Sequence, residues 1–284
     1  MKTIGLACVG GGTKAASNIG VIKAFNEAGI KISAISGTSC GSIIAVMYAL
    51  GCSPEEMLVN YKKYTKAFPK YSLIDKIKAP FLLVSRGGGK DPKVISKMLD
   101  EFLKTKSATN MKDLNMPVFI PTLDITNKKT VYYSSTNLQD EDCYLDRKIS
   151  EAIKSSSSLP LLYVPNDVYI NGELHQFLDG GMTNNTPTTH LHDFADIVIG
   201  VENKYYKYTN NKKVNLITGI RNTFQGMRRS AVVFQKKDAD LWILADCQKV
   251  DFIHGTSDDV DNCFQAGYEA TRELIRTNIK TFLE

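Results

Sequence analysis

The feature of this sequence that most restricts its fold is a strand–glycine–helix pattern that occurs twice in the first fifty residues. An apolar run over 3–9 ends in Gly10-Gly11-Gly12, and a second run over 31–36 ends in Gly37-Thr38-Ser39-Cys40-Gly41. Apolar residues at helical spacing follow each glycine cluster. Because consecutive buried strands joined by helices pair in parallel, the pattern predicts an α/β fold with a mostly parallel sheet.

The rest of the chain adds antiparallel and helical elements. Apolar runs over 117–123 and 130–135 flank a turn, and Asn171-Gly172 separates a second pair of runs, so two hairpins are predicted. Further strands are expected over 196–201 and 240–245, and further helices over 91–104, 147–154 and 265–283. No linker or repeat interrupts the sequence. We therefore expect one domain over 1–284, a three-layer sandwich with helices on both faces of the sheet.

The second glycine cluster fits a serine nucleophile. The motif Gly37-x-Ser39-x-Gly41 lies at a predicted strand-to-helix turn, where a nucleophile elbow requires small residues around a strained serine. The N-terminus of the following helix favours negative charge that develops near Ser39. A Gly-Ser turn that only packs a helix on the sheet is the alternative interpretation.

The first glycine cluster fits an oxyanion hole. Glycines at Gly10, Gly11 and Gly12 allow the backbone to approach a substrate carbonyl closely and to aim N–H groups at it. The same segment matches a loose dinucleotide-binding fingerprint that ends at Ala15. That fingerprint also requires an acidic residue about 20 positions later, where this chain has Ser36-Gly37-Thr38. Nucleotide binding is therefore disfavoured, and no cofactor is predicted.

The base that would activate Ser39 is predicted to be a carboxylate. None of the four histidines lies in a segment that indicates a catalytic loop. Asp179-Gly180-Gly181, by contrast, directly follows a hairpin strand, so that its carboxylate would be held rigidly and could approach another backbone closely. The cysteines and histidines show no metal-ligand spacing, and no metal site is predicted.

These residues resemble those of the patatin-like phospholipase family. The matching motifs are Gly10-Gly11-Gly12-x-Lys14, Gly37-Thr38-Ser39-x-Gly41, Ser156-Ser157-x-x-Pro160, Asp179-Gly180-Gly181, Asn184-Asn185-x-Pro187, Ala239-Asp240-Leu241 and Gly267-Tyr268-Glu269-Ala270. The resemblance spans nearly the whole chain. It implies a Ser39–Asp179 dyad without histidine or metal, an acyl-enzyme, and hydrolysis of fatty-acyl esters of (lyso)phospholipids or related lipids.

One residue departs from the family pattern, and two other functions stay open. The family usually has glycine after the basic residue Lys14, whereas this chain has Ala15, whose methyl group is expected to tilt the oxyanion loop or narrow the acyl entrance. An acyltransferase or thioesterase would use the same Ser39. A lipid-binding module with an inactive site is the non-enzymatic alternative.

Charge and cysteine content bear on partners and location. The net charge of +5 is too small to indicate nucleic acid. Six scattered cysteines and an N-terminus without signal-peptide features indicate a cytoplasmic protein. Residues 61–112 contain 13 Lys or Arg against 4 Asp or Glu, interleaved with aromatic residues. This segment is a candidate for peripheral contact with an anionic membrane, the alternative being ordinary solvated lysines.

Overall fold

The protein is built around one large mixed β-sheet, described here from a computed structural model. The structure describes residues 2–67, 88–90, 93–138, 142–204, 216–251 and 255–278. The strands of the large sheet are β1 (Ile4–Cys8), β2 (Ile32–Gly37), β4 (Val118–Asp124), β5 (Lys129–Ser134), β6 (Cys143–Tyr144), β8 (Asn166–Ile170), β9 (Glu173–Asp179), β10 (Ile197–Asn203) and β11 (Leu241–Ala245). Their order is β11-β10-β1-β2-β4-β5-β6, and the β8–β9 hairpin joins the sheet through β4. The strands β3 (Gly88–Lys90) and β7 (Leu161–Tyr163) form a separate pair.

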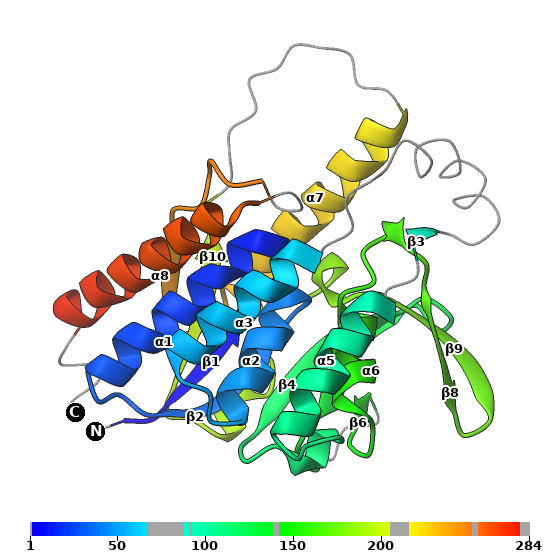
Figure 1. Cartoon of the computed structure of the whole chain (residues 1–284), viewed down its shortest axis with the longest axis horizontal. Coiled ribbons are helices and arrows are strands. Elements are labelled where there is room, and N and C mark those ends of the chain that lie inside the picture. Colours follow the sequence, from blue (N-terminus) through cyan, green and yellow to red (C-terminus); the bar gives the residue numbers. More distant parts are fainter. Residues whose placement is uncertain are drawn as a thin grey trace.

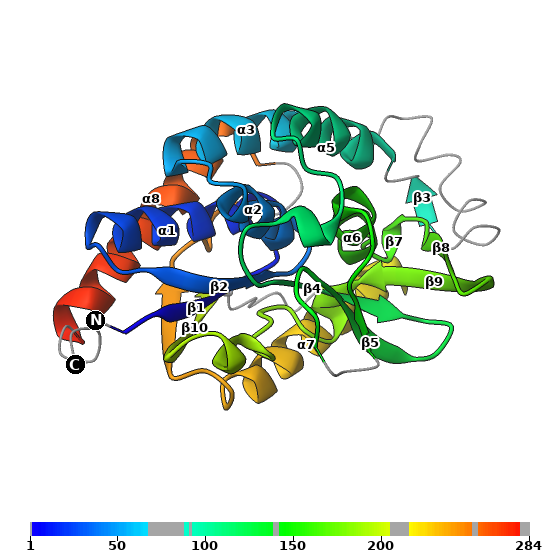
Figure 2. The ribbon, with the colours of Figure 1, turned by 90° about the horizontal axis from the view of Figure 1, so that it is seen from below.

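Helices cover both faces of this sheet (Figures 1 and 2). One layer contains α1 (Ser17–Glu27), α2 (Cys40–Ala49), α3 (Pro54–Ala67), α5 (Lys93–Thr105), α6 (Ile149–Ser156) and α8 (Ser257–Thr277). The helix α7 (Leu216–Gln235) lies on the opposite face. Short 3-10 helices are η1 (Gly12–Ala16), η2 (Met111–Asp113), η3 (Gly180–Met182) and η4 (Leu191–Asp193). The arrangement confirms the predicted three-layer α/β sandwich with a mostly parallel sheet and added hairpins.

Two hydrophobic cores lie on the two faces of the sheet. Successive side chains of a strand point to opposite faces, so β1 contributes to both cores. Ile4 and Leu6 belong to the larger core, between the sheet and the six-helix layer. Ala7 belongs to the smaller core, where it packs with Leu191 and Val198. Burial on both faces explains why β1 is an unbroken apolar run in the sequence.

The helices α1 and α8 make backbone contact at two glycines. A Cβ atom on Gly20 would lie 1.9 Å from the carbonyl oxygen of Phe264, and one on Gly267 would lie 2.0 Å from that of Ser17. Real Cβ atoms do not come this close to backbone oxygens, so both positions exclude any larger residue. This contact places α8 against η1, which begins at the last glycine of the first glycine cluster.

We expect Gly20→Ala to lower the free energy of unfolding by about 2–3 kcal/mol, because the added methyl group forces two packed helices apart. The matched control is Gly219→Ala in α7, where nothing lies within 4 Å of the added Cβ. Because alanine favours a helix interior, that variant should be as stable as the parent or more stable, by up to about 1 kcal/mol. Urea unfolding measures both, and equal values would contradict the predicted contact.

Two helices differ from the prediction. The final helix begins at Ser257 rather than 265, because Thr256 and Asp259 form a capping box in which each accepts from the backbone N–H of the other. The helix α7 was not predicted at all. Gly219 and Gly226 weaken its intrinsic helical tendency, since an interior glycine costs about 1 kcal/mol. Contacts with the rest of the protein, made through Val232 among others, favour this helix.

Candidate active site

Two strand ends approach each other along one edge of β4. The strand β2 runs parallel to β4 and pairs with it at Val118 and Phe119. The strand β9 runs antiparallel and pairs from Thr122 onward, opposite Asp179. Because β5 occupies the other edge of β4, both strands lie on the same edge. Phe119 and Thr122 are separated by about 10 Å of strand, so the chain after β2 and the end of β9 converge there.

Ser39 lies in the strained turn between β2 and α2. Its backbone has φ 53° and ψ −126°, a conformation that non-glycine residues rarely adopt. A Cβ atom on Gly37 would lie 2.4 Å from the carbonyl oxygen of Gly41, and one on Gly41 would lie 2.7 Å from that of Cys8. The Ser39 amide donates a hydrogen bond to Ser156 Oγ at 2.9 Å. These features are those of a nucleophile elbow.

Asp179 is held from several sides at the end of β9. Its side chain is 1% exposed, and its amide donates to the carbonyl oxygen of Ser158 at 2.9 Å. Its Oδ1 accepts a hydrogen bond from the Gly181 amide at 2.7 Å. Its Oδ2 lies 3.1 Å from Nη2 of Arg228, which comes from α7. Gly180 has no room for a side chain, since a Cβ there would lie 2.2 Å from the carbonyl oxygen of Pro121.

The side chain of Asn185 lies between the two predicted catalytic segments. Its Oδ1 would be 2.9 Å from a Cβ on Gly10 and 2.8 Å from a Cβ on Gly181. A Cβ atom on Gly10 would also lie 3.4 Å from the Cβ of Ser39. The glycine loop, the serine turn and the turn after Asp179 therefore meet around this one amide. The sequence marked Asn185 as part of a family motif but assigned it no role.

The charge on Asp179 also reaches the first residue of α2. Burial raises the pKa of Cys40 to about 12, and the Asp179 carboxylate contributes to the increase. A neutral thiol therefore stands beside Ser39.

The first glycine cluster forms a loop whose backbone lies in the region of positive φ at Gly11 and Gly12. Gly11 and Gly12 have φ of 151° and 53°, and the Gly12 carbonyl oxygen accepts a hydrogen bond from the Tyr61 hydroxyl at 2.6 Å. The Gly10 amide donates to the carbonyl oxygen of Asn185 at 3.0 Å, so its N–H group is engaged within the protein and not directed at a substrate. Within the described residues, no hydrogen bond is recorded for the amides of Gly11 and Gly12. These two are the candidate oxyanion donors.

The residues that follow this loop lie against other parts of the protein. The Ala15 methyl group, expected to disturb the loop, is fully buried in the larger core. The carbonyl oxygen of Lys14 accepts a hydrogen bond from Asn203 at 3.4 Å. A hydrogen bond with Cys247 and burial raise the pKa of Cys263 in α8, and the charge of Lys14 opposes the increase. The Lys14 ammonium is thus close enough to α8 to act on it.

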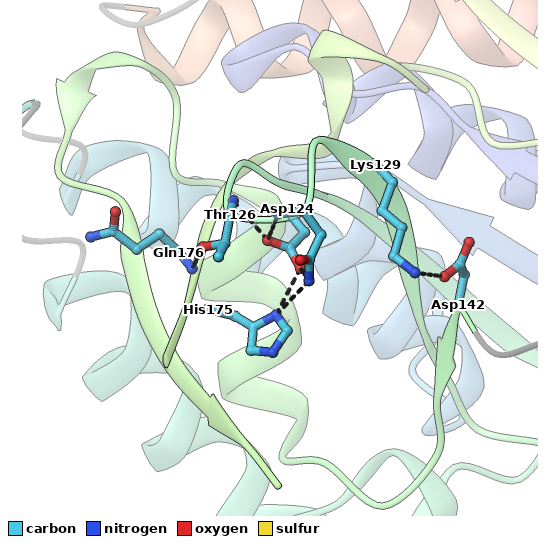
Figure 3. A network of polar contacts seen from close by, with 7 residues as sticks. Asp124, Thr126, Lys129, Asp142, His175 and Gln176 are labelled. Carbon is cyan, nitrogen blue, oxygen red and sulfur yellow. Dashed lines mark hydrogen bonds and ion pairs between the residues drawn. The ribbon is translucent and has the colours of Figure 1, made fainter. Parts of the chain in front are cut away.

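The histidine that pairs with a carboxylate is remote from Ser39. His175 Nδ1 lies 2.8 Å from Asp124 Oδ2, and the Asn127 side chain donates to the same oxygen at 3.0 Å (Figure 3). His175 precedes Asp179 by four residues in β9, which is about 13 Å of strand. Among the described residues, no histidine is hydrogen-bonded to Ser39.

The Asp124–His175 pair predicts an acid-dependent part of the protein's stability. Burial by itself would raise the pKa of Asp124, but hydrogen bonds from His175 and Asn127 outweigh it and hold that pKa below its ordinary value. The carboxylate therefore stabilises the fold above its unfolded pKa of about 3.9, and this contribution is lost as the pH falls through the lowered pKa.

We expect Asp124→Asn to lower the free energy of unfolding by about 1–2 kcal/mol near neutral pH. The difference between the variant and the parent should shrink as the pH falls below about 4, where the unfolded chain takes up the proton first, and should vanish once the folded carboxylate is protonated as well. Denaturant unfolding at a series of pH values measures this difference. A difference that is the same at every pH would contradict the assigned role of the ionised carboxylate.

The basic segment 61–112 lies only partly within the described residues. The aromatic and aliphatic residues that suggested membrane contact, from Phe68 to Leu83, fall in 68–87, outside the described part. Of the described lysines, Lys62 pairs with Asp261 at 2.6 Å, and Lys106 and Lys112 pair with acidic residues elsewhere. These pairs agree with the alternative of ordinary surface lysines for this part of the segment.

The described residues hold neither a metal cluster nor a membrane-spanning helix. No group of three or more His, Cys, Asp or Glu side chains could hold a metal ion within this part of the chain. None of the helices, as far as they are described, is long and apolar enough to cross a membrane.

Comparison with known proteins identifies the family. A sequence model described as patatin-like phospholipase matches residues 6–192. The chain is 31% identical over 189 residues to neuropathy target esterase sws of Drosophila persimilis, and 29% identical over 186 residues to human patatin-like phospholipase domain-containing protein 6. Each match covers 66% of this chain and 12% of the relative, so the chain spans a small fraction of these curated proteins.

A solved structure supports the same assignment at the level of the fold. The crystal structure of VipD from Legionella pneumophila superimposes with a TM-score of 0.54 at 14% sequence identity, over 97% of this chain and 67% of that one. At this sequence identity, the superposition shows that the two proteins share a fold. With the match over 6–192, the chain belongs to the patatin-like phospholipase family.

Proposed function

We propose that this chain is a serine lipid acyl hydrolase that uses Ser39 as nucleophile and Asp179 as base. The observation that carries the proposal is the approach of β2 and β9 along one edge of β4, with Ser39 after the first strand and Asp179 at the end of the second. The strained backbone of Ser39 supports the nucleophilic role, since such strain is typical of an exposed elbow serine. The proposed catalytic unit is the whole of 1–284.

The proposed reaction has two half-reactions. Ser39 Oγ attacks the ester carbonyl carbon while its proton passes to the Asp179 carboxylate, and the alcohol leaves with that proton. A water molecule then attacks the acyl-enzyme, with Asp179 again accepting and returning a proton, and the fatty acid is released. The amides of Gly11 and Gly12 stabilise the oxyanion in both halves, and the N-terminus of α2 adds to the favourable potential.

The substrate class follows from the family. The relatives bear the names phospholipase and esterase, and we carry to this chain the hydrolysis of fatty-acyl esters of phospholipids, lysophospholipids or related lipids. A dyad without histidine is favoured because His175, four residues before Asp179 in β9, is engaged with Asp124 at the end of β4. No histidine-dependent step is needed in this scheme.

The test is a fluorophosphonate probe combined with a panel of p-nitrophenyl esters of increasing chain length. We expect the probe to label the protein once, at Ser39 by peptide mass mapping, and to stop hydrolysis in proportion to labelling. Labelling at another residue, or hydrolysis that survives complete labelling of Ser39, would refute the proposal. Labelling of Ser39 with acyl transfer to an added alcohol instead of water would favour the transferase alternative.

A further inference from the structure

The helix α7 reaches Asp179 through one arginine. Nη2 of Arg228 lies 3.1 Å from Asp179 Oδ2, and the Arg228 side chain is only 12% exposed. The other carboxylate oxygen, Oδ1, already accepts the Gly181 amide, and the Asp179 amide is bonded to Ser158. One carboxylate oxygen thus accepts from the backbone, and the other faces the Arg228 guanidinium.

A guanidinium beside Asp179 opposes the uptake of a proton by its carboxylate. A base must take up a proton, which neutralises the carboxylate and abolishes its ion pair with Arg228. Ion pairs that are shielded from water are strong, because the effective dielectric constant there is low. Neutralising the Asp179 carboxylate would remove a compensating negative charge from the largely buried Arg228 guanidinium. The contact with Arg228 therefore restrains Asp179 for as long as α7 stays seated.

The helix α7 packs against the turn that follows Asp179. Of the described elements, α7 chiefly contacts η3, the turn that begins directly after Asp179. One further attachment is Gln235, whose Oε1 accepts from the Thr186 amide at 3.0 Å and whose Nε2 donates to the Thr183 carbonyl oxygen at 3.3 Å. A displacement of α7 would thus act first on the residues around the dyad.

The outer side of α7 presents apolar and basic side chains to solvent. Three of the seven large apolar side chains that are exposed in the described part of the chain belong to it: Met227 at 43%, Val233 at 62% and Phe234 at 68%. Met227 and Phe234 are seven residues apart and share one helix face. The stretch 221–237 contains five basic residues and no acidic one. Lys237 lies over the Phe234 ring, while Lys236 pairs with Glu202.

This combination fits the surface of an anionic lipid bilayer. Exposed apolar side chains on a basic helix enter the boundary between headgroups and acyl chains, and each basic residue near an anionic surface adds about 1 kcal/mol. The helix lies on the face opposite the six-helix layer (Figure 2). Arg228, which contacts the Asp179 carboxylate, and the exposed apolar side chains lie on the same helix, within about two helical turns of each other.

We propose that α7 is a lipid-docking latch. In the free protein, Arg228 holds the Asp179 carboxylate; when Met227, Val233 and Phe234 insert into an anionic lipid surface, α7 shifts, Arg228 leaves Asp179, and the carboxylate becomes available as base. The latch rests on the proposed function, since it regulates the same dyad. It predicts two separable properties, binding of α7 to anionic vesicles and restraint of catalysis by Arg228.

Vesicle sedimentation tests the docking surface. The probes are phosphatidylcholine vesicles with and without phosphatidylglycerol as about a third of the lipid. The parent protein should bind the anionic vesicles in a salt-sensitive manner, and Phe234→Ser should bind about tenfold more weakly, because a large apolar contact is lost. The matched control is Tyr169→Ser on β8, which removes an aromatic side chain that is 66% exposed elsewhere and should bind as the parent does. Equal binding of Phe234→Ser and the parent would refute the docking surface.

Hydrolysis of a short, water-soluble ester tests the restraint. Without vesicles, Arg228→Gln should hydrolyse the ester several times faster than the parent, and anionic vesicles should stimulate the variant far less than they stimulate the parent. A slower Arg228→Gln with an unchanged stimulation ratio would refute the latch and make Arg228 a positioning residue. Fluorophosphonate labelling separates the two levels: no labelling of Ser39 in any variant refutes the proposed function itself, whereas normal labelling with an unchanged ratio refutes the latch alone.

Discussion

Ser39→Ala is expected to lower ester hydrolysis by about 10⁴- to 10⁶-fold, the range seen when a serine hydrolase loses its nucleophile. Alanine removes Oγ and leaves the remaining geometry in place, because the hydrogen bonds recorded for Ser39 are made by its backbone amide and carbonyl. Alanine also experiences the same strain at φ 53° as serine does, so the stability of the fold should change little. The loss would therefore reflect chemistry and not unfolding.

The measurement is kcat/KM for a p-nitrophenyl ester, together with fluorophosphonate labelling and the free energy of unfolding. Ser42→Ala is the matched control, since it removes a hydroxyl from the same helix that donates to the Ser39 carbonyl oxygen. This control should keep most of the activity and all of the labelling at Ser39. A Ser39→Ala variant with more than about one per cent of the parent activity would exclude Ser39 as the nucleophile, since loss of a nucleophile removes far more than this.

Asp179→Asn is expected to lower kcat/KM by about 10³- to 10⁴-fold, near the upper range for loss of a general base. The amide oxygen can still accept the hydrogen bond from Gly181, so the turn keeps its shape, but an amide cannot take the proton of Ser39. His175→Gln should retain activity, because His175 contacts Asp124 and not the serine turn. Retained activity in Asp179→Asn together with loss in His175→Gln would overturn the dyad.

The same substitution has a consequence for stability that can be separated from catalysis. Asp179→Asn removes the negative charge that pairs with the largely buried Arg228, which should cost about 1–3 kcal/mol of unfolding free energy. The double variant Asp179→Asn/Arg228→Gln removes both charges and should recover part of that stability without recovering hydrolysis. Recovery of hydrolysis in the double variant would show that Asp179 acts on Arg228 and not on Ser39.

Most elements near the site were predictable from short stretches of sequence. The runs that form β1, β2 and β9 are continuous or alternating, as buried and half-buried strands require. The turn Asn171-Gly172 has φ of 52° and 87°, the positive values that this dipeptide favours, and it sets the register of β8 with β9. In these cases neighbouring residues alone decide the local conformation.

The helix α7 and its arginine were not predictable in the same way. Its two interior glycines lower the local helical tendency, and three of its large apolar side chains, Met227, Val233 and Phe234, face solvent. Arg228 carries no motif, and its partner Asp179 is 49 residues earlier in the chain, in another layer of the fold. Only the docking of α7 against η3 brings the two charges together.

The sequence by itself indicated where this protein makes its turns, because each glycine motif follows directly on the run of residues that forms a strand. The tertiary structure decided which of those turns meet. Ser39 and Asp179 approach each other because β2 and β9 share one edge of β4, and His175 pairs with Asp124 because of the register between β4 and β9. A turn motif can be recognised in a short segment, whereas these strand pairings join segments more than fifty residues apart and depend on how the whole core packs.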